Sequence, residues 1–75
     1  MTLLQFKFLD ESGQKLIIQE QGKYLSERID GDYTYKLYQL NNFYIEEQWH
    51  TKFNVVRNVT SFINQDQLKN YSYVI

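Results

Sequence analysis

The sequence has no cysteine, no proline, three glycines and one histidine. Without cysteine no disulfide can staple a small fold, and a structural zinc site lacks its usual sulfur ligands. We therefore expect no metal and no cofactor. No amino-terminal basic region leads into a long apolar run, and no apolar run could span a membrane, so we expect a cytoplasmic protein without membrane contact.

Alanine is also missing, whereas Asn, Lys, Ile, Tyr and Phe are abundant, a bias typical of an AT-rich bacterial genome. What is present is apolar, since 43% of the 75 residues are hydrophobic and 17% are aromatic. This composition favours one small globular domain over residues 1–75 rather than disorder or two domains. A chain this short buries only about 60% of its unfolded surface. Association with another chain is then the common way to add stability.

Alternating apolar residues near the amino terminus predict a β-hairpin. A three-residue loop that ends at Gly13 fits a type I turn with a bulge, because glycine adopts the left-handed conformation at little cost. This register sets Phe8 opposite Leu16. It also sets Phe6 opposite Ile18. The alternating residues are Leu4, Phe6 and Phe8 before the loop, and Leu16 and Ile18 after it.

A second hairpin is predicted around Asn41-Asn42, because asparagine tolerates positive φ and both flanking segments are typical of strands. Counting outward from the turn gives the cross-strand pairs Leu40 with Phe43, Tyr38 with Ile45, Lys36 with Glu47, and Thr34 with Trp49. The Lys36 and Glu47 pair is expected to form a cross-strand ion pair worth roughly 0.2 to 1 kcal/mol.

The segments around this hairpin are less distinct. Residues 24–29 suit either one helical turn or a short strand, and in both cases we expect Leu25 and Ile29 to point inward. Asp30-Gly31-Asp32 indicates a turn. Residues 54–61 are rich in valine and threonine and predict a further strand.

The carboxyl end has the start signals of a helix. Asn64 can cap it, Gln67 stands three residues later, and Ile63 and Leu68 occupy the two positions of a hydrophobic staple. A helix of about three turns would have to dock on the sheet to persist. The alternative is a terminal strand over residues 71–75, which the tyrosines and β-branched residues there permit.

The predicted fold class is α+β: an antiparallel β-meander of four to five strands with a C-terminal helix packed on one face. We assign to the covered core Tyr38, Leu40, Phe43, Ile45 and Trp49, together with Phe6 and Phe8. The opposite face is expected to lack an intramolecular cover. Its candidate interaction residues are Tyr33, Tyr35, Leu37 and Tyr44.

These residues predict protein–protein association, as a homodimer or as the accessory subunit of another protein, because tyrosines are enriched at interfaces. Tyrosines facing solvent on a sheet are an equally ordinary interpretation. In the association hypothesis, Tyr35→Glu with Leu37→Lys should abolish binding and leave the fold intact. Single-stranded nucleic-acid binding by base stacking is the alternative, but the formal net charge of -1 provides no positive track for phosphates.

The sequence does not predict an enzyme. Its one histidine, His50, lies beside a predicted turn, and no serine has the nucleophile-elbow pattern. Glu46 and Glu47 are adjacent on a strand and point to opposite faces, which disfavours a shared acid/base pair. A small enzyme active at a dimer interface is the last alternative. Partner, ligand and biological process are not determined by these residues.

Overall fold

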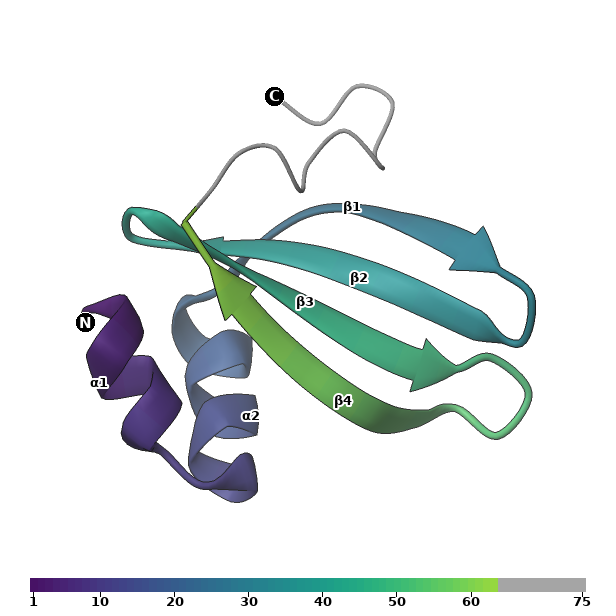
Figure 1. The fold of residues 1–75 in the computed structure, drawn as a ribbon, viewed down its shortest axis with the longest axis horizontal. Helices are drawn as coiled ribbons and strands as arrows, with labels where there is room; N and C mark the ends of the chain where they lie inside the picture. Colours follow the sequence, from purple (N-terminus) through teal and green to yellow (C-terminus); the bar gives the residue numbers. More distant parts are fainter. Residues whose placement is uncertain (64–75) are drawn as a thin grey trace.

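A computed structural model describes residues 1–63 of the chain. Two helices are followed by a four-stranded antiparallel sheet whose strand order equals the chain order, β1-β2-β3-β4. Both helices lie on one face, near one end of the sheet, and the turns after β1 and β3 lie at the far end (Figure 1). The elements are α1 (Leu3–Phe8), α2 (Glu11–Gln21), β1 (Lys23–Asp30), β2 (Tyr33–Leu40), β3 (Phe43–His50) and β4 (Val55–Phe62).

The predicted amino-terminal hairpin is wrong, because this segment forms α1 and α2. A capping box begins α1: the Thr2 hydroxyl accepts from the Gln5 N–H at 3.1 Å, and the Gln5 side chain accepts from the Thr2 N–H at 2.9 Å. At α2 the Asp10 carboxylate caps the helix by accepting from the Gly13 N–H at 2.8 Å. Gly13 therefore lies in the first turn of a helix and closes no β-turn.

The alternating apolar residues that suggested a strand also fit a helical period. Phe6 is buried, whereas Leu4 and Phe8, two residues away on either side, are exposed. Each helical residue advances the side chain by about 100°, so residues two apart point in nearly opposite directions. Assigning Phe6 to the core was right, and assigning Phe8 to it was wrong.

We predicted that a C-terminal helix covers the sheet. The helices that cover it instead come from the amino end of the chain. The sheet of the described residues has four strands, and no fifth strand occurs in that part of the chain. The C-terminal helix predicted from Asn64 onward, and the alternative strand over residues 71–75, lie outside the described residues.

The hairpin between β2 and β3 is confirmed in turn and register. Asn41 adopts a φ of 55°, and all four predicted cross-strand pairs occur. The expected ion pair is wrong in detail, because the Lys36 ammonium lies 4.3 Å from the centre of the Trp49 ring instead of on Glu47. A cation over an indole face is a favourable contact of similar size.

The outer strands β1 and β4 contain the two segments whose secondary structure or bounds the sequence did not fix, residues 24–29 and 54–61. Residues 24–29 belong to β1, which has a bulge between Tyr24 and Ser26. Leu25 packs against buried side chains, as expected, but Ile29 is 70% exposed, which contradicts its inward assignment. The predicted turn at Gly31 is present, with a φ of 62°, and the last predicted strand is β4.

Two apolar clusters hold the fold together. The larger joins the helices to the inner face of the sheet and consists of Phe6, Ile18, Leu40, Phe43 and Ile45. The smaller lies on the opposite face of the sheet and consists of Leu37, Tyr44 and Phe62. Both faces of this sheet therefore carry buried side chains, although the described helices cover only one of them.

Candidate functional site

The four candidate interaction residues lie on the face away from the helices, but they differ in exposure. Leu37 is 0% exposed and Tyr44 is 6% exposed, and the Tyr44 ring stacks on Phe62 with ring centres 5.7 Å apart. Tyr33 and Tyr35 are half-buried and their rings lie 6.5 Å apart. The expectation of an uncovered face is wrong for Leu37 and Tyr44. Whether any of the four contacts a partner remains a prediction.

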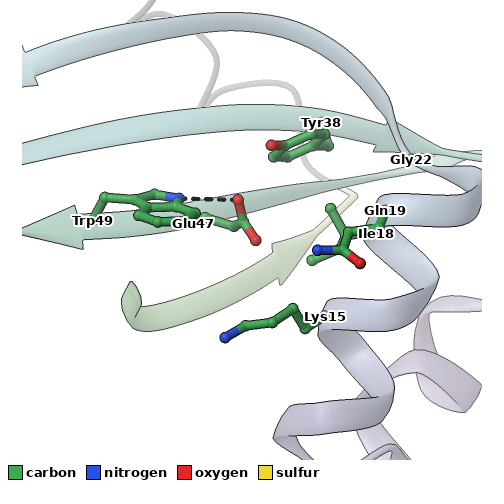
Figure 2. Close-up of a pocket in the computed structure, with 7 residues that line it drawn as sticks. All are labelled: Lys15, Ile18, Gln19, Gly22, Tyr38, Glu47 and Trp49. Carbon is green, nitrogen blue, oxygen red and sulfur yellow. Dashed lines mark hydrogen bonds between the residues drawn. The ribbon is translucent and has the colours of Figure 1, made fainter. Parts of the chain in front are cut away.

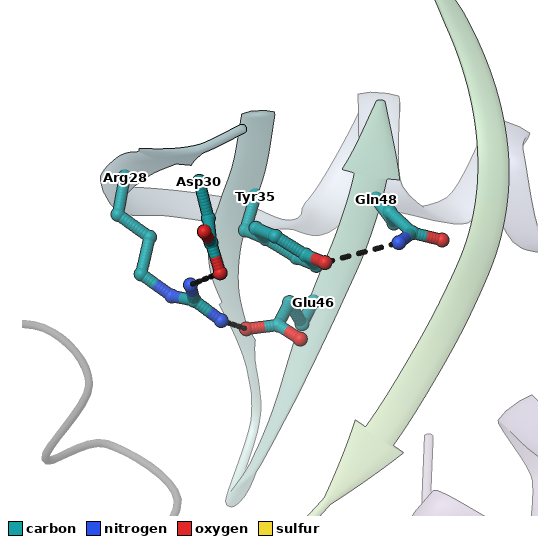
Figure 3. Close-up of polar contacts among 5 residues, drawn as sticks. All are labelled: Arg28, Asp30, Tyr35, Glu46 and Gln48. Atoms are coloured by element: carbon teal, nitrogen blue, oxygen red, sulfur yellow. Dashed lines mark hydrogen bonds and ion pairs between the residues drawn. The ribbon is translucent and has the colours of Figure 1, made fainter. Parts of the chain in front are cut away.

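Tyr35 is embedded in polar contacts with neighbouring strands (Figure 3). The Arg28 guanidinium lies over its ring, 4.1 Å from the ring centre, and its hydroxyl accepts from the Gln48 side chain at 3.0 Å. Arg28 also approaches two carboxylates, at 3.7 Å from Glu46 and 3.8 Å from Asp30. The positive charge on this face is thus matched by acidic neighbours, which argues against a phosphate track for nucleic acid.

The helices present a second apolar surface, which the sequence analysis missed. Leu4 is 64% exposed and Phe8 is 82% exposed, and they lie one turn apart on α1. Leu16 on α2 is more than half exposed and lies about 200° around its helix from the buried Ile18. We call Leu4, Phe8 and Leu16, which each point away from the buried residue of their own helix, the outer helical face. A helical reading of the amino-terminal spacing would have found it.

A buried carboxylate faces the helices from the middle of β3. Glu47 is 4% exposed, although it lies on the same face as Ile45 and Trp49. The Trp49 Nε1 donates a hydrogen bond to Glu47 Oε1 at 3.0 Å. Since a buried carboxylate costs free energy unless it is satisfied, this contact helps to hold it there. One oxygen of the carboxylate is thereby fixed against the indole.

Glu47 lines a pocket of about 450 Å³ between α2 and the sheet (Figure 2). The helices cover one end of this face of the sheet (Figure 1), and the pocket is lined by residues of α2, β2 and β3. In Figure 2 the second carboxylate oxygen points toward the side chains of α2, away from the indole. The lining residues are Lys15, Ile18, Gln19, Gly22, Tyr38, Glu47 and Trp49.

The sequence analysis placed Glu47 in a cross-strand ion pair with Lys36 and did not identify this pocket. One signal was present, because Glu47 stands alone as an acid on a face whose other members near the turn are apolar. The pattern alone fits two positions of Glu47 equally well: one at an edge where its carboxylate is solvated, and one under a helix. The two interpretations differ only once α2 is known to pack above β2 and β3.

Tyr38 is the group in the pocket whose titration is clearly altered. Burial, and then the nearby negative charge of Glu47, raise the pKa of Tyr38 from 10.0 to about 12. The stability that the neutral phenol contributes is therefore complete below the unfolded value of 10.0 and is lost as pH rises through about 12. We expect the wild type to lose more unfolding free energy than Tyr38→Phe over this range. Urea unfolding at a series of pH values measures it, and parallel losses would contradict the prediction.

His50 ends β3 and is engaged by its own turn. Its Nδ1 accepts from the Phe53 N–H at 3.3 Å, and its ring lies 4.7 Å from the Phe53 ring, centre to centre. Within residues 1–63, no three acidic or histidine side chains gather closely enough to hold a metal ion. Across the same residues, neither helix has the length and apolar character needed to cross a membrane.

No family model, no curated protein and no solved structure matches this chain.

Proposed function

We propose that this protein functions through protein–protein association, as a homodimer that forms through the outer helical face. The observation that carries the proposal is the exposure of Leu4 and Phe8 on the side of α1 opposite the buried Phe6. Both sides of one short helix are therefore apolar. No rotation of α1 could bury Phe6 together with Leu4 and Phe8 against a single sheet.

Leu4 and Phe8 leave most of their apolar surface in water in the described monomer. Burying a Leu or Phe side chain that would otherwise stay in water is worth about 1.5 to 3 kcal/mol. The six residues of α1 are too few for a helix to persist without packing, so this segment needs its neighbours. A second chain placed over Leu4 and Phe8 would stabilise α1 from its open side.

A second copy of this chain is the partner that fits this surface. A two-fold contact brings the same patch of both copies together, and it is the commonest soluble assembly. A standard interface buries about 800 Å² per partner, so Leu4, Phe8 and Leu16 would form its apolar centre rather than all of it.

The test is a double substitution, Leu4→Lys with Phe8→Glu. Losing about 2 kcal/mol of apolar burial on each copy should weaken the dimer roughly a thousand-fold. Sedimentation equilibrium over a wide concentration range should give a dimer for the wild type and a monomer for the variant. Far-ultraviolet circular dichroism should be unchanged, because neither side chain is buried in the monomer.

Phe53→Glu is the matched control, since Phe53 is 65% exposed in the turn between β3 and β4, at the far end of the sheet. It should leave the dimer intact. A wild-type monomer at every concentration would sink the homodimer, and a dimer that Phe53→Glu dissociates would move the contact to the other end. Repeating the wild-type measurement at high salt should not change the mass, because the contact is mainly apolar.

We further propose that this association takes place in the cytoplasm of a bacterium, where the residue bias of the chain is typical of an AT-rich genome. The proposal assigns no catalytic step to any residue. Tyr33 and Tyr35 remain candidates for a second contact, which would be weaker because each is half-buried. Nucleic-acid binding is not proposed, since Arg28 already faces Glu46 and Asp30.

A further inference from the structure

We propose that the pocket between α2 and the sheet binds a small organic ammonium ion with an apolar body, its ammonium group on the Glu47 carboxylate. This site lies on a different part of the molecule from the outer helical face, and its function does not depend on dimerisation. The inference rests on the anion at the back of the pocket, the apolar and aromatic walls, and the position of the nearest cations.

The anion is built into the fold. Glu47 is buried, and its Oε1 is held by the Trp49 indole at 3.0 Å, so the carboxylate has a fixed position before any ligand arrives. Its second oxygen points into the pocket (Figure 2). An ammonium N–H donor is the natural complement of a carboxylate oxygen, and such charge-assisted hydrogen bonds are about twice as strong as neutral ones. An anionic ligand would meet repulsion at the same place.

The walls suit a flat apolar group. Ile18 lies on the helix side, and the Tyr38 and Trp49 rings lie on the sheet side. A volume of about 450 Å³ falls within the range of small-molecule pockets, which runs from roughly 300 to 1,000 Å³. Gln19 adds an amide at the α2 side that can orient a polar substituent. The pocket is therefore larger than an inorganic cation requires.

The two nearby lysines leave the carboxylate available. Among the described residues the ion pairs are those of Arg28, so neither Lys15 nor Lys36 lies within ion-pair distance of Glu47. Lys36 is instead over the Trp49 ring. Lys15 is the cation among the residues that line the pocket, and its ammonium can fold onto Glu47 in solution. Lys15 thus competes with a ligand, and removing its charge should strengthen amine binding.

Trp49 provides a direct readout, because it is the single tryptophan of the chain and it lines the pocket. The probes are phenethylammonium, the neutral 2-phenylethanol and the anionic phenylacetate, which share an aromatic body and differ in charge. Titration of Trp49 fluorescence should saturate with phenethylammonium at a dissociation constant on the order of millimolar or tighter. The alcohol should bind more weakly, and the acid should give no saturable change.

Three substitutions locate the effect. Glu47→Gln keeps the shape and removes the charge, and it should weaken phenethylammonium binding about ten- to hundred-fold. Glu20→Gln is the matched control, the same change at an exposed position of α2, and should leave the affinity within about two-fold. Lys15→Gln should tighten amine binding about two- to five-fold, since it removes the competing ammonium.

The wild-type charge series keeps the test decisive even where Glu47→Gln fails to fold. Equal affinities for the amine and the alcohol would overturn the proposal, because the carboxylate would then contribute nothing. Saturable binding of phenylacetate alone would also overturn it and would assign the pocket to anions through Lys15. A perturbed Trp49 indole N–H resonance that appears with the amine, and is lost in Glu47→Gln, would establish the site.

Discussion

Phe43→Ala is expected to unfold at a much lower urea concentration than the wild type. Phe43 is fully buried where β3 meets the helices, and its ring packs on Phe6 with ring centres 5.8 Å apart. Truncating a buried Phe to Ala typically lowers the unfolding free energy by about 3 to 5 kcal/mol, because apolar burial is lost and a cavity is left behind. The whole unfolding free energy of a 75-residue chain is roughly 4 to 11 kcal/mol. One substitution would therefore remove a large part of it.

Urea unfolding followed by circular dichroism measures this loss. The control is Phe53→Ala, which deletes the same atoms from an exposed turn and should change the unfolding free energy by less than about 0.5 kcal/mol. If both variants unfolded at the wild-type midpoint, α1 would not be joined to the sheet through this ring pair. The amino-terminal helices would then be an independent segment rather than the cover of the core.

Leu37→Asp should strongly destabilise the fold through the opposite face of the sheet. Leu37 is fully buried beside Tyr44, and its cross-strand neighbour on β3 is Glu46. An aspartate there would be desolvated and would face another carboxylate, a combination expected to cost about 3 to 5 kcal/mol. The unfolding midpoint in urea is the measurement, and protonation at low pH should partly restore the fold by neutralising the new carboxylate.

Ile29→Asp is the matched control, because Ile29 is an exposed strand residue on β1 and its substitution should leave the midpoint nearly unchanged. A Leu37→Asp variant as stable as this control would mean that the far face is open to water. The sequence-based design of Tyr35→Glu with Leu37→Lys assumed such an open face. The structure instead gives the expectation that its Leu37 substitution damages the fold.

The hairpin of β2 and β3 is the part of the fold that the sequence predicted in detail. Its information is local, since Asn41 tolerates a φ of 55° and the period-two pattern on either side admits one register that keeps apolar residues together. The strand β4 and the turn at Gly31 were predicted for the same reason. Each of these features depends on residues close together in the chain.

The amino-terminal segment shows where local information is ambiguous. Its apolar residues satisfy a two-residue period at Leu4, Phe6 and Phe8, and a three-residue period at Leu3, Phe6 and Leu9. The caps at Thr2 and Asp10 favour the second, but only packing against Phe43 and Leu40 makes a six-residue helix persist. A sequence pattern that fits two periods is decided by which of them finds a surface to bury against.

The sequence by itself therefore determined an α+β chain with an antiparallel meander, the register of its central hairpin and its dependence on a small apolar core. Only the tertiary structure decided which end of the chain covers the sheet, which apolar residues stay exposed on α1, and that Glu47 lies buried under the edge of α2. The physical reason is that burial is a property of two surfaces brought together. A residue's neighbours along a strand fix its direction, but the element packed above it fixes whether that direction leads to water, to a core or to a pocket.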